Sequence, residues 1–406
     1  MADFRARVAV IMGGRSLLYA ALAVALALRV ARAVTAGDAQ GFSDSDSYIT
    51  IADNLLAGRG FVWGDQLAGR PPLYPLMIAA TRITLFGRHF LLLYLVQAVL
   101  GTLTVYFFWL SAGRLIGRGA GALTALLLAA YPFHVYYVGT VLSETLFIFL
   151  VSAVFMLLVK TIEDGRLGWA AGCGIISGAA HLTRPSVLGL VVIFAAMAAW
   201  RLRPPTRGIS AAALLLGAAF LAALPWGLRN RAVTGHFLIS TTGVGASLYD
   251  GLGPQADGSS DMSFLNEMNE LEEMDEFERD RYLRDKAIET GASSPLRAGR
   301  LAVVKAWRFW TPVPNDPSFR TPLYVVVSLL AVAPVYLLAL AGLAGRVVKL
   351  ERLLTIAAAP LYFTLLHMVF VGSTRYRAPV MPFVMMIAAA WVAMMVEDPA
   401  QRTTEH

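Results

Sequence analysis

Cysteine and charged residues are both scarce in this sequence. The chain of 406 residues has a single cysteine, Cys173, so no disulfide can form within it. Only 15% of the residues are charged and 57% are hydrophobic, whereas soluble domains have about 25% charged residues. This composition excludes an ordinary soluble domain and predicts an all-α polytopic membrane protein.

Several sequence motifs of soluble enzymes are also missing. The chain has no Walker sequence, no HExxH, no CxxC and no dinucleotide fingerprint, which argues against a cytosolic mechanism driven by nucleotides. The formal net charge is +7, but the basic residues are dispersed among apolar runs. We therefore expect no nucleic-acid partner, and the bilayer surface or a phosphorylated lipid is the expected anionic partner.

Long apolar segments make up about half of the chain. Because about 20 apolar residues cross a bilayer, we predict ten spans. They lie at about 16–33, 89–112, 119–138, 143–160, 167–182, 185–201, 208–226, 321–345, 353–371 and 377–396. The apolar segment 73–86 is too short to cross at about 14 residues, so we place it as a helix in the outer membrane interface.

The distribution of basic residues predicts the orientation. With a cytoplasmic amino terminus, every predicted cytoplasmic loop is basic, as the positive-inside rule requires. The loop residues that carry this pattern are Arg114, Arg118, Lys160, Arg166, Arg201, Arg203, Arg207, Arg346, Lys349 and Arg352, with Arg402 in the carboxy-terminal tail. We expect both termini to be cytoplasmic in a bacterial plasma membrane.

Three parts are predicted along the chain. Residues 1–226 form a transmembrane core that includes a polar first outer loop at 34–88 with a short amphipathic helix at 46–56. Residues 227–320 form a small outer domain, and residues 321–406 form the last spans and a cytoplasmic tail. The outer domain is expected to contain a Gly-rich stretch (241–258), an acidic helical run (265–287) and an amphipathic helix (295–310). We expect the acidic residues to form a solvated face, and docking of a cationic acceptor is the alternative.

Six arginines depart from the positive-inside pattern because they lie at predicted outer ends of spans or in outer loops. They are Arg70, Arg184, Arg229, Arg231, Arg375 and Arg377. Pairing with outer acidic residues or lipid headgroups is one interpretation. Convergence on one anionic ligand is the other, because guanidinium groups bind phosphate oxygens in a bidentate manner.

Three carboxylates lie at the same predicted outer boundary. Asp44 and Asp46 belong to the sequence Asp44-Ser-Asp-Ser-Tyr48, and Glu144 lies in the outer turn between two spans. Each is either a headgroup-level anchor or helix cap, or part of a site. Carboxylates beside arginines suit glycosyl transfer from a phospholipid donor, because one carboxylate takes a proton from the acceptor while cations stabilise the departing phosphate.

The motifs together resemble those of GT-C-type glycosyltransferases, in the group that includes protein O-mannosyltransferases and lipid A aminoarabinose transferases. The resemblance covers nearly the whole chain and rests on the order and position of short motifs. These are Asp44–Tyr48, Leu55–Phe61, Arg70–Pro75, Tyr131–Pro132, Ser143–Phe147, Leu182–Pro185, Pro225–Trp226 with Arg229–Asn230, and Arg375–Arg377 before Pro379 and Pro382–Phe383.

The resemblance implies a periplasmic active site and transfer of a sugar from a polyprenyl-phosphate carrier, with inversion at the anomeric carbon. It implies that Asp44 is the catalytic aspartate, that Glu144 is the second acidic residue, and that Arg70 and Arg375 bind the carrier phosphate. Asp46 adds a carboxylate that competes for the role of base. We do not expect the outer carboxy-terminal domain that is typical of many larger relatives.

Other residues complete the predicted site. Arg377, Arg184 and Arg229 are further candidates for the donor phosphate. Tyr48, Tyr74, His134 and Tyr137 are the candidates for the wall of a substrate cavity. No cofactor is predicted, and a divalent metal ion is left open.

Two other functions remain open at this point. A transporter or flippase of a lipid-linked sugar also needs outer arginines, but it places charged or broken helices near the membrane midplane in matching halves, and no two-fold repeat is visible. A non-catalytic membrane subunit of a larger complex is the other alternative. The sugar and the acceptor, whether glycan, lipid or protein, are not indicated by the sequence.

Overall fold

The computed structural model describes residues 15–38 and 42–396. Both predicted cytoplasmic tails, at 1–14 and 397–406, lie outside the described residues. Within the described residues, six helices are long and apolar enough to cross a membrane. These are α2 (Arg15–Thr35), α5 (Leu91–Leu115), α8 (Glu144–Asp164), α11 (Pro205–Thr234), α16 (Pro322–Ala344) and α17 (Leu350–Val369). The chain is therefore a multi-pass membrane protein, as predicted.

The predicted count of ten spans is not confirmed. The segment 119–138 forms a pair of helices, α6 (Arg118–Ala129) and α7 (Pro132–Val138), bent by 53°, which gives a seventh span if the pair crosses as one. Three further predicted spans coincide with short helices. They are α9 (Leu167–His181), α10 (Leu188–Arg201, preceded by the 3₁₀ turn η1, Pro185–Val187) and α18 (Met381–Val396). At 1.5 Å per residue, about 16 residues cover about 24 Å, which is less than the bilayer core.

The bend between α6 and α7 has a local cause. Pro132 has no N–H to donate to the carbonyl of Leu128, so α6 ends there. Arg29 of α2 is fully buried and replaces the missing donor. Its Nη2 donates to the Leu128 carbonyl at 3.2 Å and its Nη1 to the Ala129 carbonyl at 2.9 Å. The arginine inside the bundle thus satisfies the carbonyls that the helix break exposes.

The centre of the bundle lies at α8 and α18, whose residues are mostly buried. Phe383 of α18 packs edge-on against Phe155 of α8, with ring centroids 4.7 Å apart, and against Phe108 of α5 at 5.1 Å. The outer helices instead expose leucines and valines, for example Leu330 of α16 and Leu365 of α17. Exposed apolar faces on long helices are the faces that lipid covers.

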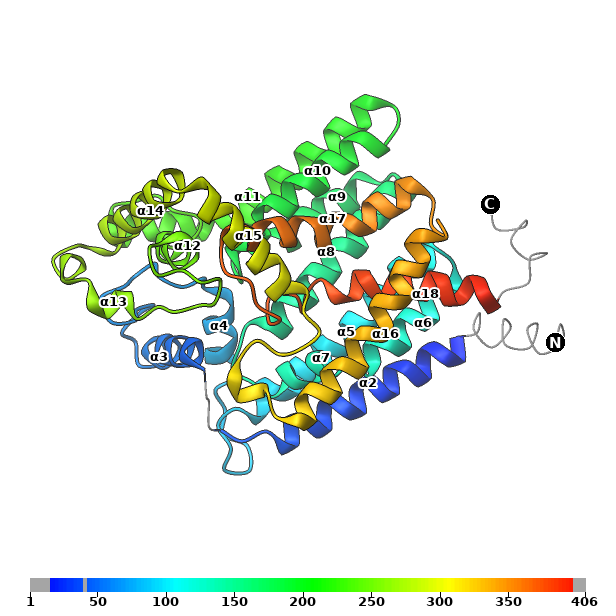
Figure 1. Cartoon of the computed structure of the whole chain (residues 1–406), viewed down its shortest axis with the longest axis horizontal. Coiled ribbons are helices and arrows are strands. Elements are labelled where there is room, and N and C mark those ends of the chain that lie inside the picture. Colours follow the sequence, from blue (N-terminus) through cyan, green and yellow to red (C-terminus); the bar gives the residue numbers. More distant parts are fainter. Residues whose placement is uncertain (1–14, 39–41, 397–406) are drawn as a thin grey trace.

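The loops predicted to be cytoplasmic lie at one end of the bundle, and the regions predicted to be outer lie at the other. At one end, Arg114 pairs with Asp164 at 2.7 Å, and the Nε of Arg207 donates to the Gly165 carbonyl at 2.8 Å. These contacts join loops that were predicted to be cytoplasmic. At the other end, the N–H of Thr242 donates to the carbonyl of Ala68 at 3.1 Å, which joins the two predicted outer regions. Figure 1 shows α3, α4, α12 and α14 together at that end, away from the start of α2 and the end of α18.

The first predicted outer region contains two short helices, α3 (Ser43–Leu56) and α4 (Leu73–Ala80). The second contains α12 (Val244–Leu252), α13 (Phe264–Glu267), the 3₁₀ turn η2 (Asn269–Leu271), α14 (Glu276–Ser293), α15 (Pro295–Trp310) and the turn η3 (Pro317–Phe319). The acidic run predicted as one helix is broken before α14. Asp275 begins α14 with a capping box, in which its side chain accepts from the N–H of Glu278 and the Glu278 carboxylate accepts from the N–H of Asp275.

Candidate functional site

A cavity of about 1830 Å³ lies where the predicted outer regions meet the ends of the membrane helices. Its floor is formed by the ends of α7, α8 and α9 and by the segment between α17 and α18. The opposite side of the cavity is formed by α12 and the loops around it. The polar residues that line it include Asp44, Arg70, Arg184, Arg375, Ser247, Asp250 and Asn266. The cavity therefore combines a charged centre with one wall from the bundle and one from the predicted outer domain.

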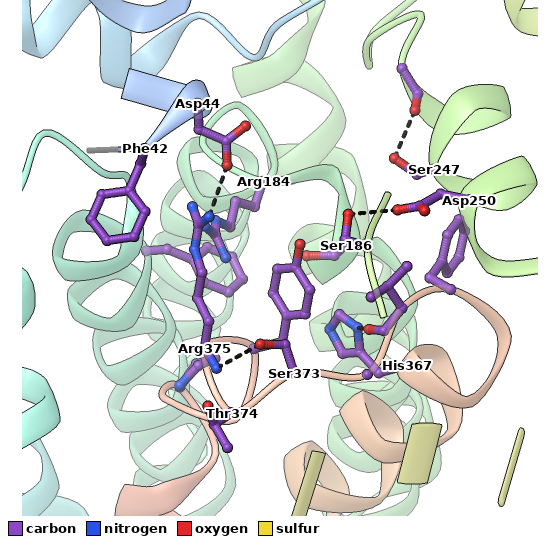
Figure 2. A pocket seen from close by; sticks show the side chains of 18 of the residues that line it. Phe42, Asp44, Arg184, Ser186, Ser247, Asp250, His367, Ser373, Thr374 and Arg375 are labelled. Atoms are coloured by element: carbon purple, nitrogen blue, oxygen red, sulfur yellow. Dashed lines mark hydrogen bonds and ion pairs between the residues drawn. The ribbon is translucent and has the colours of Figure 1, made fainter. Parts of the chain in front are cut away.

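Asp44 lies in the first turn of α3 and is held by two arginines from distant parts of the chain. Its Oδ1 is 3.1 Å from Nη2 of Arg70, in the loop before α4. Its Oδ2 is 2.9 Å from Nη1 of Arg375, in the segment after α17. Figure 2 shows the Asp44 carboxylate directed toward the guanidinium of Arg375, with Arg184 beside it. Residues 331 positions apart in sequence thus meet in one ion-paired cluster.

Glu144 is the first residue of α8 and is almost fully buried. Its Oε1 pairs with Nη2 of Arg184 at 2.5 Å and also with Nε of Arg375. The Nε of Arg184 donates to the Ser143 hydroxyl at 2.9 Å. A carboxylate at a helix amino terminus is further favoured by the helix dipole. Arg375 therefore bridges the two carboxylates, and Glu144 fixes both Arg184 and Arg375.

The cluster carries one excess positive charge, because three guanidinium groups face two carboxylates. Burial alone would raise the pKa of Asp44, but the charges of Arg375, Arg70 and Arg184 outweigh it and lower the pKa below its ordinary value. Two buried donors, Nε of Arg70 and Nη2 of Arg375, have no hydrogen-bond partner among the residues that the structure describes. Unpaired cationic donors beside a cavity fit an anionic ligand.

The loop that carries Arg70 is held from two sides. From α11, Nη2 of Arg229 donates to the Phe61 carbonyl at 2.9 Å, and its Nη1 donates to the Leu67 carbonyl. From α14, the Glu276 carboxylate accepts from the N–H groups of Leu67 and Ala68 at 3.1 Å. It also accepts from the hydroxyl of Thr242 at 3.0 Å. Glu276 is buried, so the prediction that the acidic run is wholly a solvated face is wrong at this residue.

The segment that carries Arg375 is held by α15 and the residues after it. Nζ of Lys305 donates to the Val369 carbonyl at 2.7 Å. The Asn315 side chain accepts from the N–H of Thr374 at 2.6 Å. Gly372 passes so close to the backbone of Lys305 that a side chain there would collide with it. The predicted outer domain thus fixes both arginine-bearing segments, which the sequence did not indicate.

Two predicted phosphate-binding arginines lie away from the cavity. Arg229 donates to backbone carbonyls, as described above. Arg377 is buried and donates to the Thr311 carbonyl and, at 3.0 Å, to the Tyr336 hydroxyl. Neither side chain lines the cavity. Their placement gives them a role in holding the backbone, whereas Arg231 is exposed.

Some of the remaining predicted residues line the cavity and others do not. Tyr48 and Tyr137 line the cavity, whereas Tyr74 and His134 lie behind it. The Tyr74 hydroxyl donates to the Gln97 side chain at 3.1 Å, and Nε2 of His134 is 2.9 Å from the Ala378 carbonyl. Asp46 is exposed and does not line the cavity. Of the predicted carboxylates, Asp44 and Glu144 are the pair that the structure brings together with arginines.

Within residues 15–38 and 42–396, no group of three histidine, cysteine or acidic side chains is placed to hold a metal ion.

Comparison with known proteins places this site in a known fold. Residues 69–226, which include Arg70, Glu144 and Arg184, match the family described as dolichyl-phosphate-mannose-protein mannosyltransferase. The archaeal oligosaccharyltransferase AglB from Archaeoglobus fulgidus, in complex with an inhibitory peptide and a dolichol-phosphate, has a similar structure. Its TM-score is 0.55 at 16% identity, over 94% of this chain and 50% of that chain. The chain has the fold of GT-C-type glycosyltransferases.

The predicted resemblance to GT-C-type enzymes is thereby confirmed. The apo form of the Archaeoglobus fulgidus oligosaccharyltransferase gives a TM-score of 0.54 at 14% identity, over 92% of this chain and 50% of that one. ArnT from Cupriavidus metallidurans bound to undecaprenyl phosphate gives a TM-score of 0.40 at 15% identity. The match covers 94% of this chain and 78% of the ArnT chain. No curated protein matches by sequence. The chain spans about half the length of the archaeal structures.

Proposed function

We propose that this protein is a membrane glycosyltransferase that moves a sugar from a polyprenyl-phosphate carrier to an acceptor on the outer face of a bacterial plasma membrane. The observation that carries the proposal is the cluster of Asp44, Glu144, Arg70, Arg184 and Arg375. It combines a partly exposed carboxylate with an excess of cationic donors at the end of an apolar bundle. A phosphate on a lipid carrier satisfies both the charge and the apolar surroundings.

The proposed reaction is a single displacement. Asp44 takes the proton of the acceptor hydroxyl or amine while the oxygen or nitrogen of the acceptor forms a bond to the anomeric carbon. The bond between that carbon and the phosphate oxygen breaks, and the electron pair leaves with the polyprenyl phosphate. Attack from the face opposite the leaving group inverts the anomeric carbon. Arg70 and Arg375 stabilise the negative charge that develops on the phosphate.

Donor binding also changes the state of Asp44 in this scheme. In the free protein, Arg70 and Arg375 both pair with its carboxylate. A phosphate that takes over these guanidinium groups draws them away from the carboxylate, which raises the proton affinity of Asp44. The base thus becomes stronger when the donor is present. Glu144 remains paired with Arg184 and keeps the cluster in place.

The comparisons support this proposal. The matched family is described by transfer from dolichyl-phosphate-mannose, and the AglB structure was obtained with a dolichol-phosphate and a peptide. We propose a hexosyl or pentosyl group as the sugar. The acceptor is a glycan, a lipid or a protein. The location on the outer face, with both termini cytoplasmic, rests on the basic residues of the opposite loops.

The test is donor consumption by purified protein in lipid nanodiscs supplied with a bacterial membrane extract as the source of acceptor. Undecaprenyl-phosphate-linked hexoses and pentoses are added singly, and released undecaprenyl phosphate is measured by mass spectrometry. We expect at least one donor to be consumed by the wild type and by Asp46→Asn. Asp44→Asn should lose about 10²-fold or more of that rate, the usual contribution of a general base. Equal rates in Asp44→Asn would contradict the role of Asp44.

A further inference from the structure

Helix α15 has an unusual distribution of polarity. Its exposed apolar residues are Leu296, Val303 and Trp307, with 91%, 66% and 70% of their surface exposed. Arg300 is exposed beside them. At 100° per residue these four side chains fall within an arc of about 60° on one face of the helix. Large apolar residues gathered on one exposed face mark a contact surface.

The opposite face of α15 contains a buried lysine. Leu301, Lys305 and Phe309 lie about 180° from the exposed stripe and are buried against the rest of the protein. Lys305 is 0% exposed, and burial lowers its pKa to about 8. A helix in water places lysine outside and tryptophan inside. This helix does the reverse at Lys305 and Trp307.

Contacts place the carboxy-terminal half of α15 at the level of a membrane-helix end. Nε1 of Trp310 donates to the Thr364 hydroxyl of α17 at 3.1 Å, and Phe309 stacks on His367 at 5.5 Å. Lys305 reaches Val369, the last residue of α17. Figure 1 shows α15 running from the outer domain toward α16 and α17. The end of α17 that α15 contacts is itself exposed and apolar, at Leu365 and Val369.

We propose that α15 lies in the outer interface of the bilayer, with the stripe of Leu296, Val303 and Trp307 among lipid acyl chains and Arg300 at the headgroup phosphates. Tryptophan is enriched at this depth, and arginine extends its charge to the headgroups. The bilayer is the expected occupant because the stripe continues the lipid-facing surface of the adjoining span. The buried face of the same helix contacts the segment 369–375. By fixing α15, the membrane interface would also hold the segment that carries Arg375.

Tryptophan quenching by lipid tests this assignment. The wild type and Trp307→Phe are compared in nanodiscs of phosphatidylcholine brominated near the top of its acyl chains, and separately with aqueous iodide. Trp307 is one of eight tryptophans, so the difference between the two proteins isolates its emission. We expect Trp307→Phe to lose a component that brominated lipid quenches and iodide does not. Trp310→Phe is the control, because Trp310 packs against α16 and α17.

Two results would overturn the proposal. If the component lost in Trp307→Phe is quenched by iodide and not by brominated lipid, the stripe faces water. If neither reagent quenches it, protein covers the stripe, and cross-linking would then identify a second copy or another chain. Phenylalanine keeps the apolar character of position 307, so we expect the variant to fold. The measurement needs no sugar donor, so its result is independent of the proposed reaction.

Discussion

At the scale of single residues, the proposed chemistry depends on Asp44 and the arginines around it. The sequence located them because Arg70, Arg184 and Arg375 are cations at predicted outer boundaries, where the positive-inside rule disfavours them. The carboxylates were found by their position beside the same boundaries. Which carboxylate pairs with which arginine depends on the directions of the side chains, and a sequence motif does not show these directions. The structure supplied them.

The pH dependence of stability follows from the charge on Asp44. Its pKa is lowered from 3.8 because Arg375, Arg70 and Arg184 outweigh the effect of burial. The ionised carboxylate therefore stabilises the folded state above about pH 4, and this contribution is lost as the pH falls through the lowered pKa. We expect the difference in melting temperature between the wild type and Asp44→Asn to be constant from about pH 7 to 5 and to shrink below about 4.

Thermal unfolding in detergent at a series of pH values measures this difference. Asp46→Asn serves as control, because Asp46 is exposed and two residues away. A difference that stays constant down to about pH 3 would show that Asp44 is not stabilised as an anion by its arginines.

Removal of metal ions should leave donor consumption unchanged. The two carboxylates of the cluster are already paired with Arg70, Arg184 and Arg375, and the excess positive charge repels a divalent cation. Rates before and after treatment with a chelator, and after readdition of Mg²⁺ or Mn²⁺, test this expectation. A loss of activity that the added metal restores would contradict it.

At the scale of elements, the sequence located most helices but not their lengths or contacts. Every predicted span contains a helix, yet α9, α10 and α18 are short, because apolar composition does not show where a helix ends inside a bundle. The acidic run was predicted as one helix, but the capping box at Asp275 starts a new one. Arg229 and Arg377 were predicted to bind phosphate. They donate to backbone carbonyls from loops far away in sequence, and Arg377 also donates to the Tyr336 hydroxyl, which no local pattern reveals.

The contact between α14 and the loop before α4 predicts the effect of Glu276→Gln. The amide removes the negative charge and one acceptor oxygen from a site that receives three donors. We expect faster hydrogen exchange at residues 66–70 and about 10-fold weaker binding of undecaprenyl phosphate, which corresponds to about 1.4 kcal/mol. Glu273→Gln is the matched control because Glu273 is exposed nearby.

A double variant separates positioning from general destabilisation. If Glu276 acts through the loop that carries Arg70, Glu276→Gln should weaken binding much less in the Arg70→Ala background than in the wild type. Additive losses in the double variant would indicate that Glu276 affects the whole fold instead.

At the scale of the whole molecule, the chain combines a membrane bundle with a predicted outer domain whose contacts support the charged cluster. The bundle contributes Glu144 and Arg184 at helix ends, and the outer loops contribute Asp44 and Arg70. The fold is that of GT-C-type enzymes at about half the length of the archaeal relatives. Composition was enough to predict the membrane class, whereas the supporting role of the domain emerged only from its contacts.

The most direct test of the account is native mass spectrometry of the protein released gently from detergent, to detect a bound polyprenyl phosphate with or without a sugar. The wild type is compared with Arg375→Ala and with Arg231→Ala, whose arginine is exposed and lies outside the cavity lining. We expect the carrier mass on the wild type and on Arg231→Ala and its loss from Arg375→Ala. Ordinary phospholipids alone, equal on all three proteins, would contradict a phosphate site at this cluster.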